Sequence, residues 1–154
     1  MGKGKSVVER IGLLGGAFDP VHHGHMALAR VAVEALGLDR IIFVPSAHPP
    51  HKDSAEMAPF LHRVAMLQRA LVQEKKYQFS RIEERLQRPS YTIDTIHALK
   101  RMLGSSSSLW FVIGSDAFND IFTWKAYREV LAEINMLVIR RSNRNLESSA
   151  QVLK

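Results

Sequence analysis

One segment, residues 15–25 (Gly-Gly-Ala-Phe-Asp-Pro-Val-His-His-Gly-His), constrains the fold of this chain more than any other. It follows the apolar run at residues 11–14 and precedes a helical pattern that begins near Gly24 and extends through Leu36. The segment therefore predicts a strand that turns into a helix, with a glycine pair at the turn and histidines in the first helical turn. Unpaired N–H groups at a helix start attract anions, and glycines let a phosphate approach the backbone closely. We therefore expect a phosphate site and chemistry at a phosphorus atom.

The rest of the chain alternates between strand-like and helix-like patterns. Apolar runs predict strands at residues 10–14, 40–45, 78–82, 109–113 and 136–139, and periodicity predicts helices at 26–36, 59–72, 92–103 and 126–134. Such alternation is typical of a parallel sheet with right-handed crossovers and helices on both faces. We predict a single Rossmann-like α/β domain over residues 1–154, a doubly wound parallel sheet in the order 3-2-1-4-5. The polar tail after residue 139 is predicted to be poorly ordered.

Helix signals refine this prediction. Pro59 suits the first turn of the second helix, and Gly37 and Gly104 follow positions where helices commonly end. An apolar stripe in the second helix is predicted to face the core; it consists of Leu61, Val64, Ala65, Leu67, Leu71 and Val72.

Charge and composition limit the possible partners. The net charge of +6 favours anionic ligands. Because the basic residues do not form a run interleaved with aromatics, a nucleic-acid partner is not predicted. No apolar run approaches the roughly 20 residues that a membrane span requires, so no membrane partner is predicted either. The absence of cysteine fits a cytoplasmic protein.

The predicted topology brings two motifs together. In a doubly wound sheet, ligands bind beyond the carboxyl ends of the strands, where the strand order reverses. The glycine-histidine segment follows the first strand, and Gly114-Ser115-Asp116 follows the fourth. In the order 3-2-1-4-5 these strands are neighbours, so both motifs are expected to line one cleft.

The histidines also invite a metal-site interpretation. His22, His23 and His25, with His48 and His51 in a nearby loop, offer enough imidazoles for zinc. The usual helical pair at i and i+4 with an adjacent glutamate is missing, so no protein-bound metal is predicted. Incidental placement at a capped helix start is the better interpretation for His23 alone.

At this point the chain resembles a known family. Gly-Gly-x-Phe-Asp-Pro-x-His-x-Gly-His is similar to the hallmark of the HxGH nucleotidyltransferases, and in particular of the bacterial nicotinate mononucleotide adenylyltransferases. Four further segments occur in the family's order: Pro49-Pro50-His51-Lys52, Arg88-Pro89-Ser90-Tyr91-Thr92, Ile113-Gly114-Ser115-Asp116 and Thr123-Trp124. The resemblance covers roughly residues 9–141, and it implies the Rossmann-like fold predicted above.

The resemblance implies adenylyl transfer from ATP to nicotinate mononucleotide, giving nicotinate adenine dinucleotide and pyrophosphate in NAD biosynthesis. Mg²⁺ would arrive with the triphosphate, and a homo-oligomer is possible. The implied catalytic residues are His22 and His25, which would contact the ATP phosphates. The implied ATP-binding residues are Gly15, Gly16, Phe18, Gly24, Gly114 and Asp116, of which Gly24 would add N–H donors and Asp116 would accept ribose hydroxyls. The implied substrate-binding residues are Lys52 for a phosphate, Tyr91 and Thr92 for the nicotinate carboxylate, and Trp124 for the pyridine ring.

Several alternatives stay open from the residues alone. Trp124 could be a core residue, and Asp116 could be an N-cap. A sister enzyme acting on phosphopantetheine usually has Thr in place of His22 and lacks the Thr-Trp pair. Family members usually have Thr or Ser at the position of Ala17, and they continue through a C-terminal Ser-Ser-Thr-x-Ile-Arg motif that grips ATP phosphates. We expect the chain to lack that region, which predicts a rate loss of about 10²-fold or more, or a nucleotide-binding remnant without turnover.

Overall fold

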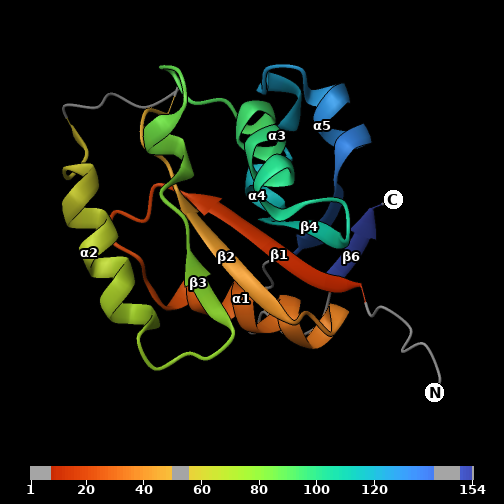
Figure 1. Cartoon of the computed structure of the whole chain (residues 1–154), viewed down its shortest axis with the longest axis horizontal. Coiled ribbons are helices and arrows are strands. Elements are labelled where there is room, and N and C mark those ends of the chain that lie inside the picture. Colours follow the sequence, from red (N-terminus) through yellow and green to blue (C-terminus); the bar gives the residue numbers. More distant parts are fainter. Residues whose placement is uncertain (1–7, 50–55, 141–149, 154) are drawn as a thin grey trace.

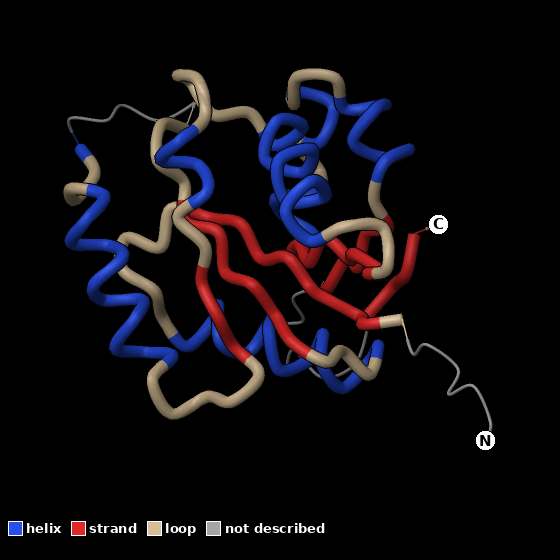
Figure 2. Tube along the Cα trace, in the orientation of Figure 1, coloured by secondary structure: helices blue, strands red, loops and turns tan. Residues whose placement is uncertain are grey.

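The computed structural model describes residues 8–49 and 56–140, and the backbone of 150–153. Within these ranges six strands form one sheet in the order β3-β2-β1-β4-β5-β6 (Figures 1 and 2). All neighbours from β3 to β5 are parallel, whereas β6 runs antiparallel to β5. The predicted order 3-2-1-4-5 is therefore confirmed. The strands are β1 (Glu9–Gly16), β2 (Arg40–Pro45), β3 (Tyr77–Phe79), β4 (Ser107–Gly114), β5 (Asn135–Ile139) and β6 (Ala150–Leu153).

Helices cover both faces of the sheet, as the α/β prediction requires. One face carries α1 (His23–Leu36) and α2 (Phe60–Leu71), and the other carries α3 (Thr92–Leu103) and α5 (Tyr127–Glu133). The sequence did not indicate three short elements at the ends of strands and loops. These are the 3-10 helices η2 (Ile82–Arg85) and η3 (Ile121–Thr123), and the single turn α4 (Ser115–Phe118).

The alternation of side chains along each strand divides the core in two. Ile11 and Leu13 of β1 pack toward α3 and α5, whereas Leu14 packs toward α1 and α2. Strands covered on both faces in this way read as continuous apolar runs. No helix in the described part of the chain combines the length and hydropathy that a bilayer crossing requires.

Three sequence predictions about secondary structure need correction. The third strand ends at Phe79 and does not reach residue 82, because Ile82 already belongs to η2. Pro59 is the N-cap of α2 and does not lie in its first turn. The tail, predicted to be poorly ordered, contributes β6, which pairs with β5 and thereby covers backbone groups that an edge strand would expose.

The prediction of which α2 residues face the core was partly wrong. Leu61 is 59% exposed and Val72 is 78% exposed, whereas the charged Arg63 is only 2% exposed. The buried positions are Arg63, Val64, Leu67 and Leu71, which still follow the helical spacing. A guanidinium therefore occupies a core position.

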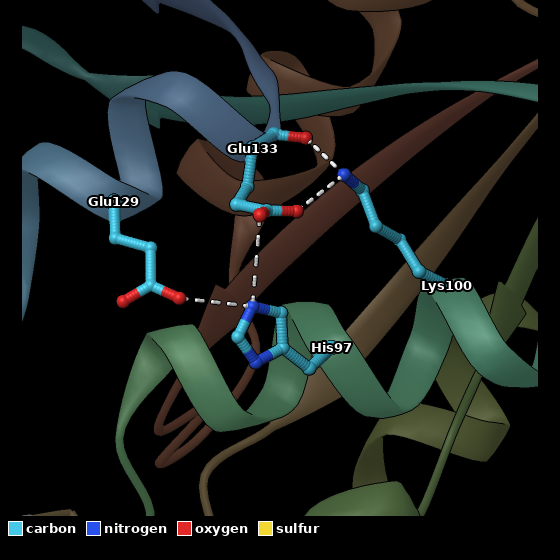
Figure 3. Close-up of polar contacts among 4 residues, drawn as sticks. All are labelled: His97, Lys100, Glu129 and Glu133. Atoms are coloured by element: carbon cyan, nitrogen blue, oxygen red, sulfur yellow. Dashed lines mark hydrogen bonds and ion pairs between the residues drawn. The ribbon is translucent and has the colours of Figure 1, made fainter.

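A polar bridge joins α3 to α5 on the outer surface (Figure 3). The ammonium of Lys100 donates to the Glu133 carboxylate at 2.8 Å and also to the Glu133 carbonyl oxygen. Nε2 of His97 lies 3.4 Å from a Glu129 oxygen and 4.0 Å from a Glu133 oxygen. The hydrogen bond from Lys100, reinforced by its charge, lowers the pKa of Glu133.

This bridge predicts a pH-dependent contribution to stability. Because the pKa of Glu133 is lower in the folded state, its contribution is present above the ordinary carboxyl value and is lost as the pH falls below about 4. We expect the melting temperature of Lys100→Met to fall less than that of the wild type between neutral and acid pH. The exposed Lys75, substituted in the same way, should retain the wild-type profile. Identical profiles for Lys100→Met and the wild type would contradict the assignment.

Candidate active site

A cleft of about 520 Å³ opens at the carboxyl ends of β1, β2 and β4. Its floor includes the last residues of β1, Gly15 and Gly16, and on the β4 side it includes Gly114 and Asp116. The two motifs that the topology was expected to bring together therefore do line one cleft. A Cβ added at Gly114 would meet nothing within 4 Å, so the backbone there faces open space.

His22 and His25 stack against each other at the start of α1. Their ring centroids are 3.8 Å apart with an interplanar angle of 28°. Nδ1 of His22 accepts the N–H of Gly24 at 3.1 Å, and Nδ1 of His25 accepts the N–H of His22 at 3.1 Å. The two histidines thus form a capping box, the reciprocal arrangement that Ser and Glu usually make at N-cap and N3.

The capping box determines what each imidazole offers to a ligand. An Nδ1 atom that accepts a hydrogen bond carries no proton, so the proton of each ring must lie on Nε2. Both rings line the cleft. Each is therefore a preorganised N–H donor, with its orientation fixed by the helix start. The spacing His22-x-x-His25 at the start of a helical pattern is the sequence signal that could have revealed this cap.

Two predicted roles need correction. The N–H of Gly24, which the sequence analysis offered to a phosphate, already donates to His22, because the histidine side chain caps the helix. Phe18, predicted to shape the nucleotide pocket directly, is 1% exposed and is not part of the cleft lining. Its ring packs against His25 with a centroid separation of 4.8 Å and against Phe43 at 5.6 Å. Phe18 therefore supports His25 from behind.

Arg63 ties together the loops that form the cleft. Its Nη1 donates to the carbonyl oxygen of Ala17 at 2.7 Å and of Ser46 at 2.8 Å, and its Nε donates to that of Ala58 at 2.9 Å. Ala17 follows β1 and Ser46 follows β2, and both residues line the cleft. Burial lowers the pKa of Arg63, although Asp19 and Glu83 oppose the shift. No sequence signal indicated this role beyond a helical position.

Asp19 holds the same loop. Its Oδ2 accepts the N–H of Ala58 at 3.2 Å. The segment that precedes α2 is thus anchored to the loop after β1 through both Asp19 and Arg63.

A buried carboxylate forms another part of the wall. Glu83 is 8% exposed and lines the cleft. It accepts the Thr95 hydroxyl at 2.8 Å and the N–H of Ala47 at 3.1 Å. Burial raises the pKa of Glu83, while both hydrogen bonds and the charge of Arg63 act against the rise. Since both oxygens are engaged, Glu83 connects η2 to α3 and to the loop after β2.

The start of α3 and the residue after η3 contribute the side chains expected to bind the mononucleotide. Tyr91, Thr92 and Trp124 all line the cleft. The Trp124 ring also packs edge-to-face on the core residue Phe111, with centroids 5.8 Å apart. The core interpretation and the ligand interpretation of Trp124 therefore hold together, since one part of the ring packs and another lines the cleft.

The remaining predicted residues divide into two groups. Asp116 lines the cleft and lies inside α4, whose N-cap is Gly114, so the N-cap interpretation of Asp116 is wrong. Lys52 lies outside the residues that the structure describes.

In the described ranges, one cluster of side chains has the composition and spacing of a metal site. His97, Glu129 and Glu133 bring their ligand atoms within 4.8 Å of one another. None of the three lines the cleft, and the ammonium of Lys100 already binds Glu133. We interpret this cluster as the bridge between α3 and α5 described above.

Comparisons with known proteins agree with this geometry. Residues 13–153 match the cytidylyltransferase-like family. The chain is 45% identical over 136 residues to a protein of Desulfotalea psychrophila named probable nicotinate-nucleotide adenylyltransferase, covering 87% of the chain and 64% of the relative. It is 41% identical to a protein of Solibacter usitatus with the same name, covering 93% of the chain and 76% of the relative. The chain thus spans about two thirds to three quarters of the length of these two relatives.

A solved structure shows the same fold. Nicotinic acid mononucleotide adenylyltransferase of Plasmodium falciparum, complexed with NaAD, superposes with a TM-score of 0.74 at 21% identity. The superposition covers 88% of the chain and 66% of the neighbour.

Proposed function

The chain belongs to the cytidylyltransferase-like family and, within it, to the nicotinate-nucleotide adenylyltransferases, and from this premise we propose that it transfers the adenylyl group of ATP to nicotinate mononucleotide. The mononucleotide phosphate attacks the α-phosphorus of ATP, and pyrophosphate leaves. The products are nicotinate adenine dinucleotide and pyrophosphate, so the reaction belongs to NAD biosynthesis. The same proposal assigns the protein to the cytoplasm.

The observation that carries this proposal is the stacked histidine pair. Charge develops on the phosphate oxygens during transfer, and donors already aimed at that charge lower the barrier without reorganising. The Nε2–H groups of His22 and His25 are two such donors, because the capping box fixes both Nδ1 atoms as acceptors. The attacking phosphate is already ionised, so the reaction needs no general base.

The other residues of the cleft would bind and orient the two substrates. Gly15 and Gly16 leave the floor open for the phosphate chain, and Asp116 would accept hydrogen bonds from ribose hydroxyls. Trp124 would stack on the pyridine ring, beside Tyr91 and Thr92. Holding the reacting groups in line is the main task of an enzyme of this class.

Mg²⁺ fits the cleft as a companion of the triphosphate. Magnesium prefers oxygen ligands and usually keeps several waters and substrate phosphates in its shell. The carboxylates that line the described cleft are Glu83, whose oxygens are both engaged, and Asp116. Asp116 could contribute one ligand or an outer-sphere contact; the ion would neutralise phosphate charge.

The proposal is tested by incubating the chain with ATP, Mg²⁺ and nicotinate mononucleotide and following pyrophosphate release. We expect release that depends on the mononucleotide. The rival function is nucleotide binding without turnover. Calorimetric ATP binding without release would establish that rival.

Substitution of Trp124 tests the substrate orientation. We expect Trp124→Ala to raise the KM for the mononucleotide about tenfold, because a ring face is worth roughly 1–3 kcal/mol in stacking. The KM for ATP should change little. Trp124→Phe keeps an aromatic face and should restore most of the affinity. Equal increases in both KM values would indicate a purely structural role.

A further inference from the structure

The bridge between α3 and α5 holds three metal-ligating side chains on the outer surface (Figure 3). His97 comes from α3, whereas Glu129 and Glu133 are four residues apart on α5 and therefore share one face of that helix. One ligand atom from each residue lies within 4.8 Å of the other two. Zinc is bound in proteins by imidazole nitrogen and by carboxylate oxygen. Imidazole also suits the neighbouring transition ions, whereas Mg²⁺ prefers oxygen alone.

The distances between the ligand atoms suit an ion placed among them. A tetrahedral Zn²⁺ with bonds of about 2.0–2.2 Å keeps its ligand atoms about 3.3–3.6 Å apart. Nε2 of His97 and Oε1 of Glu129 are already 3.4 Å apart, and Nε2 lies 4.0 Å from Oε1 of Glu133. Modest rotations of the side chains would therefore complete the set, without a change in the packing of the two helices.

Lys100 occupies only one oxygen of Glu133. Its ammonium donates to Oε2 at 2.8 Å and to the Glu133 carbonyl oxygen, whereas Oε1 is the atom that faces His97. A hydrogen bond of this kind fixes the orientation of a ligating carboxylate. A metal-bound imidazole is neutral, so two carboxylates and one ammonium leave the cluster with a net negative charge. A divalent cation would compensate that charge.

The cluster is open to solvent on one side. The side chains of His97, Glu129 and Glu133 are 34%, 51% and 36% exposed. An ion can therefore enter without any opening of the fold, and water can complete its coordination. Three protein ligands and a water are a common arrangement for zinc.

We propose that His97, Glu129 and Glu133 bind one divalent transition ion with the ligand preferences of Zn²⁺, and that this ion clamps α3 to α5. The ion would take the place of the contacts between His97 and the two glutamates, while Lys100 keeps its hydrogen bonds to Glu133. Because the ligands come together only when the two helices are packed, the ion should stabilise the folded state. The proposal is independent of adenylyl transfer, since none of the three residues lines the cleft.

The test is a calorimetric titration of the metal-free, full-length chain with Zn²⁺ in the absence of nucleotides. We expect one ion to bind per chain. Zn²⁺ at a hundred times its Kd should raise the melting temperature by about 5–10 °C. Mg²⁺ at the same concentration should leave the melting temperature unaltered, because the cluster offers it an imidazole.

Two ligand variants and one matched control locate the ion. We expect His97→Gln and Glu129→Gln each to weaken Zn²⁺ binding at least tenfold, since each removes one of three ligands. His62→Gln, which removes an exposed histidine from α2, should bind Zn²⁺ like the wild type. Each melting temperature is compared with that of the same variant without zinc, so a loss of intrinsic stability does not affect the result.

The stacked pair His22 and His25 is the alternative place for a zinc ion. Zn²⁺ binding that His22→Ala weakens and His97→Gln leaves intact would place the ion in the cleft and overturn the proposal. A wild-type chain that binds no Zn²⁺ would overturn it as well. Pyrophosphate release by such a chain would leave the proposed function standing, so the two proposals fail separately.

Discussion

Replacing His22 with alanine is expected to lower kcat for adenylyl transfer about 10²- to 10³-fold. The substitution removes one of the two preorganised donors that the capping box directs to the cleft. Because the donor acts mainly on charge that develops in the transition state, the KM for the mononucleotide should change little. Single-turnover rates of pyrophosphate release measure the effect directly.

Two further variants exclude a trivial explanation for the loss. The alanine substitution also removes an N-cap, which is worth about 1 kcal/mol. His22→Ser can keep the cap, since serine is a preferred N-cap residue, but it cannot reach as far as the imidazole; it should be as slow as His22→Ala and more stable. His23→Ala, at an exposed histidine outside the cleft lining, should retain the wild-type rate. Wild-type turnover in His22→Ala would remove His22 from the mechanism.

Replacing Arg63 with alanine should have the largest effect on stability, about 3–5 kcal/mol. The substitution leaves the carbonyl oxygens of Ala17, Ser46 and Ala58 without their donor. It also empties the space beside α2 that the buried Arg63 side chain fills. Each partly buried carbonyl that loses its partner carries a desolvation cost of its own. Urea denaturation monitored by circular dichroism measures the change in the free energy of unfolding.

The same arginine should also affect the cleft. Arg63→Lys keeps the charge but lacks the planar fork that reaches three carbonyl groups. We expect it to fold and to show raised KM values for both substrates, since two of the three loops line the cleft. Arg69→Ala, on the exposed face of α2, should change the stability by no more than about 0.5 kcal/mol. If Arg63→Ala is as stable as Arg69→Ala, the three hydrogen bonds do not organise the cleft.

Patterns that are local in the sequence predicted much of this fold. The continuous apolar runs at residues 40–45 and 109–113 predicted buried parallel strands, and the periodicity of residues 92–103 matches α3 at both ends. The cleft followed from topology, because motifs at the ends of the first and fourth strands must meet at one edge of the sheet. His22 and His25 belong to the segment that topology placed in the cleft, whereas Tyr91, Thr92 and Trp124 were implied by the family resemblance; all five line the cleft.

Features that depend on distant partners were missed. Arg63 reads as a solvated charge on α2 until the carbonyl groups of Ala17 and Ser46, which come from two other loops, are seen to surround it. β6 was missed because four residues are too short for a recognisable strand pattern. The strand is defined by its pairing with β5.

The central position of β1 determines when this protein can acquire its cleft during synthesis. Register pairing joins Ile11 to Leu109, so the ribosome must release most of the chain before β1 obtains its second neighbour. Non-local parallel pairing of this kind is slow, and until it is complete the apolar faces of β1 and α1 stay available to chaperones or to other nascent chains. A nucleotide that contacts the ends of both β1 and β4 would bind only the finished sheet, so it would shift the equilibrium toward that state. Cellular ATP would then act on this protein as a folding ligand before it acts as a substrate.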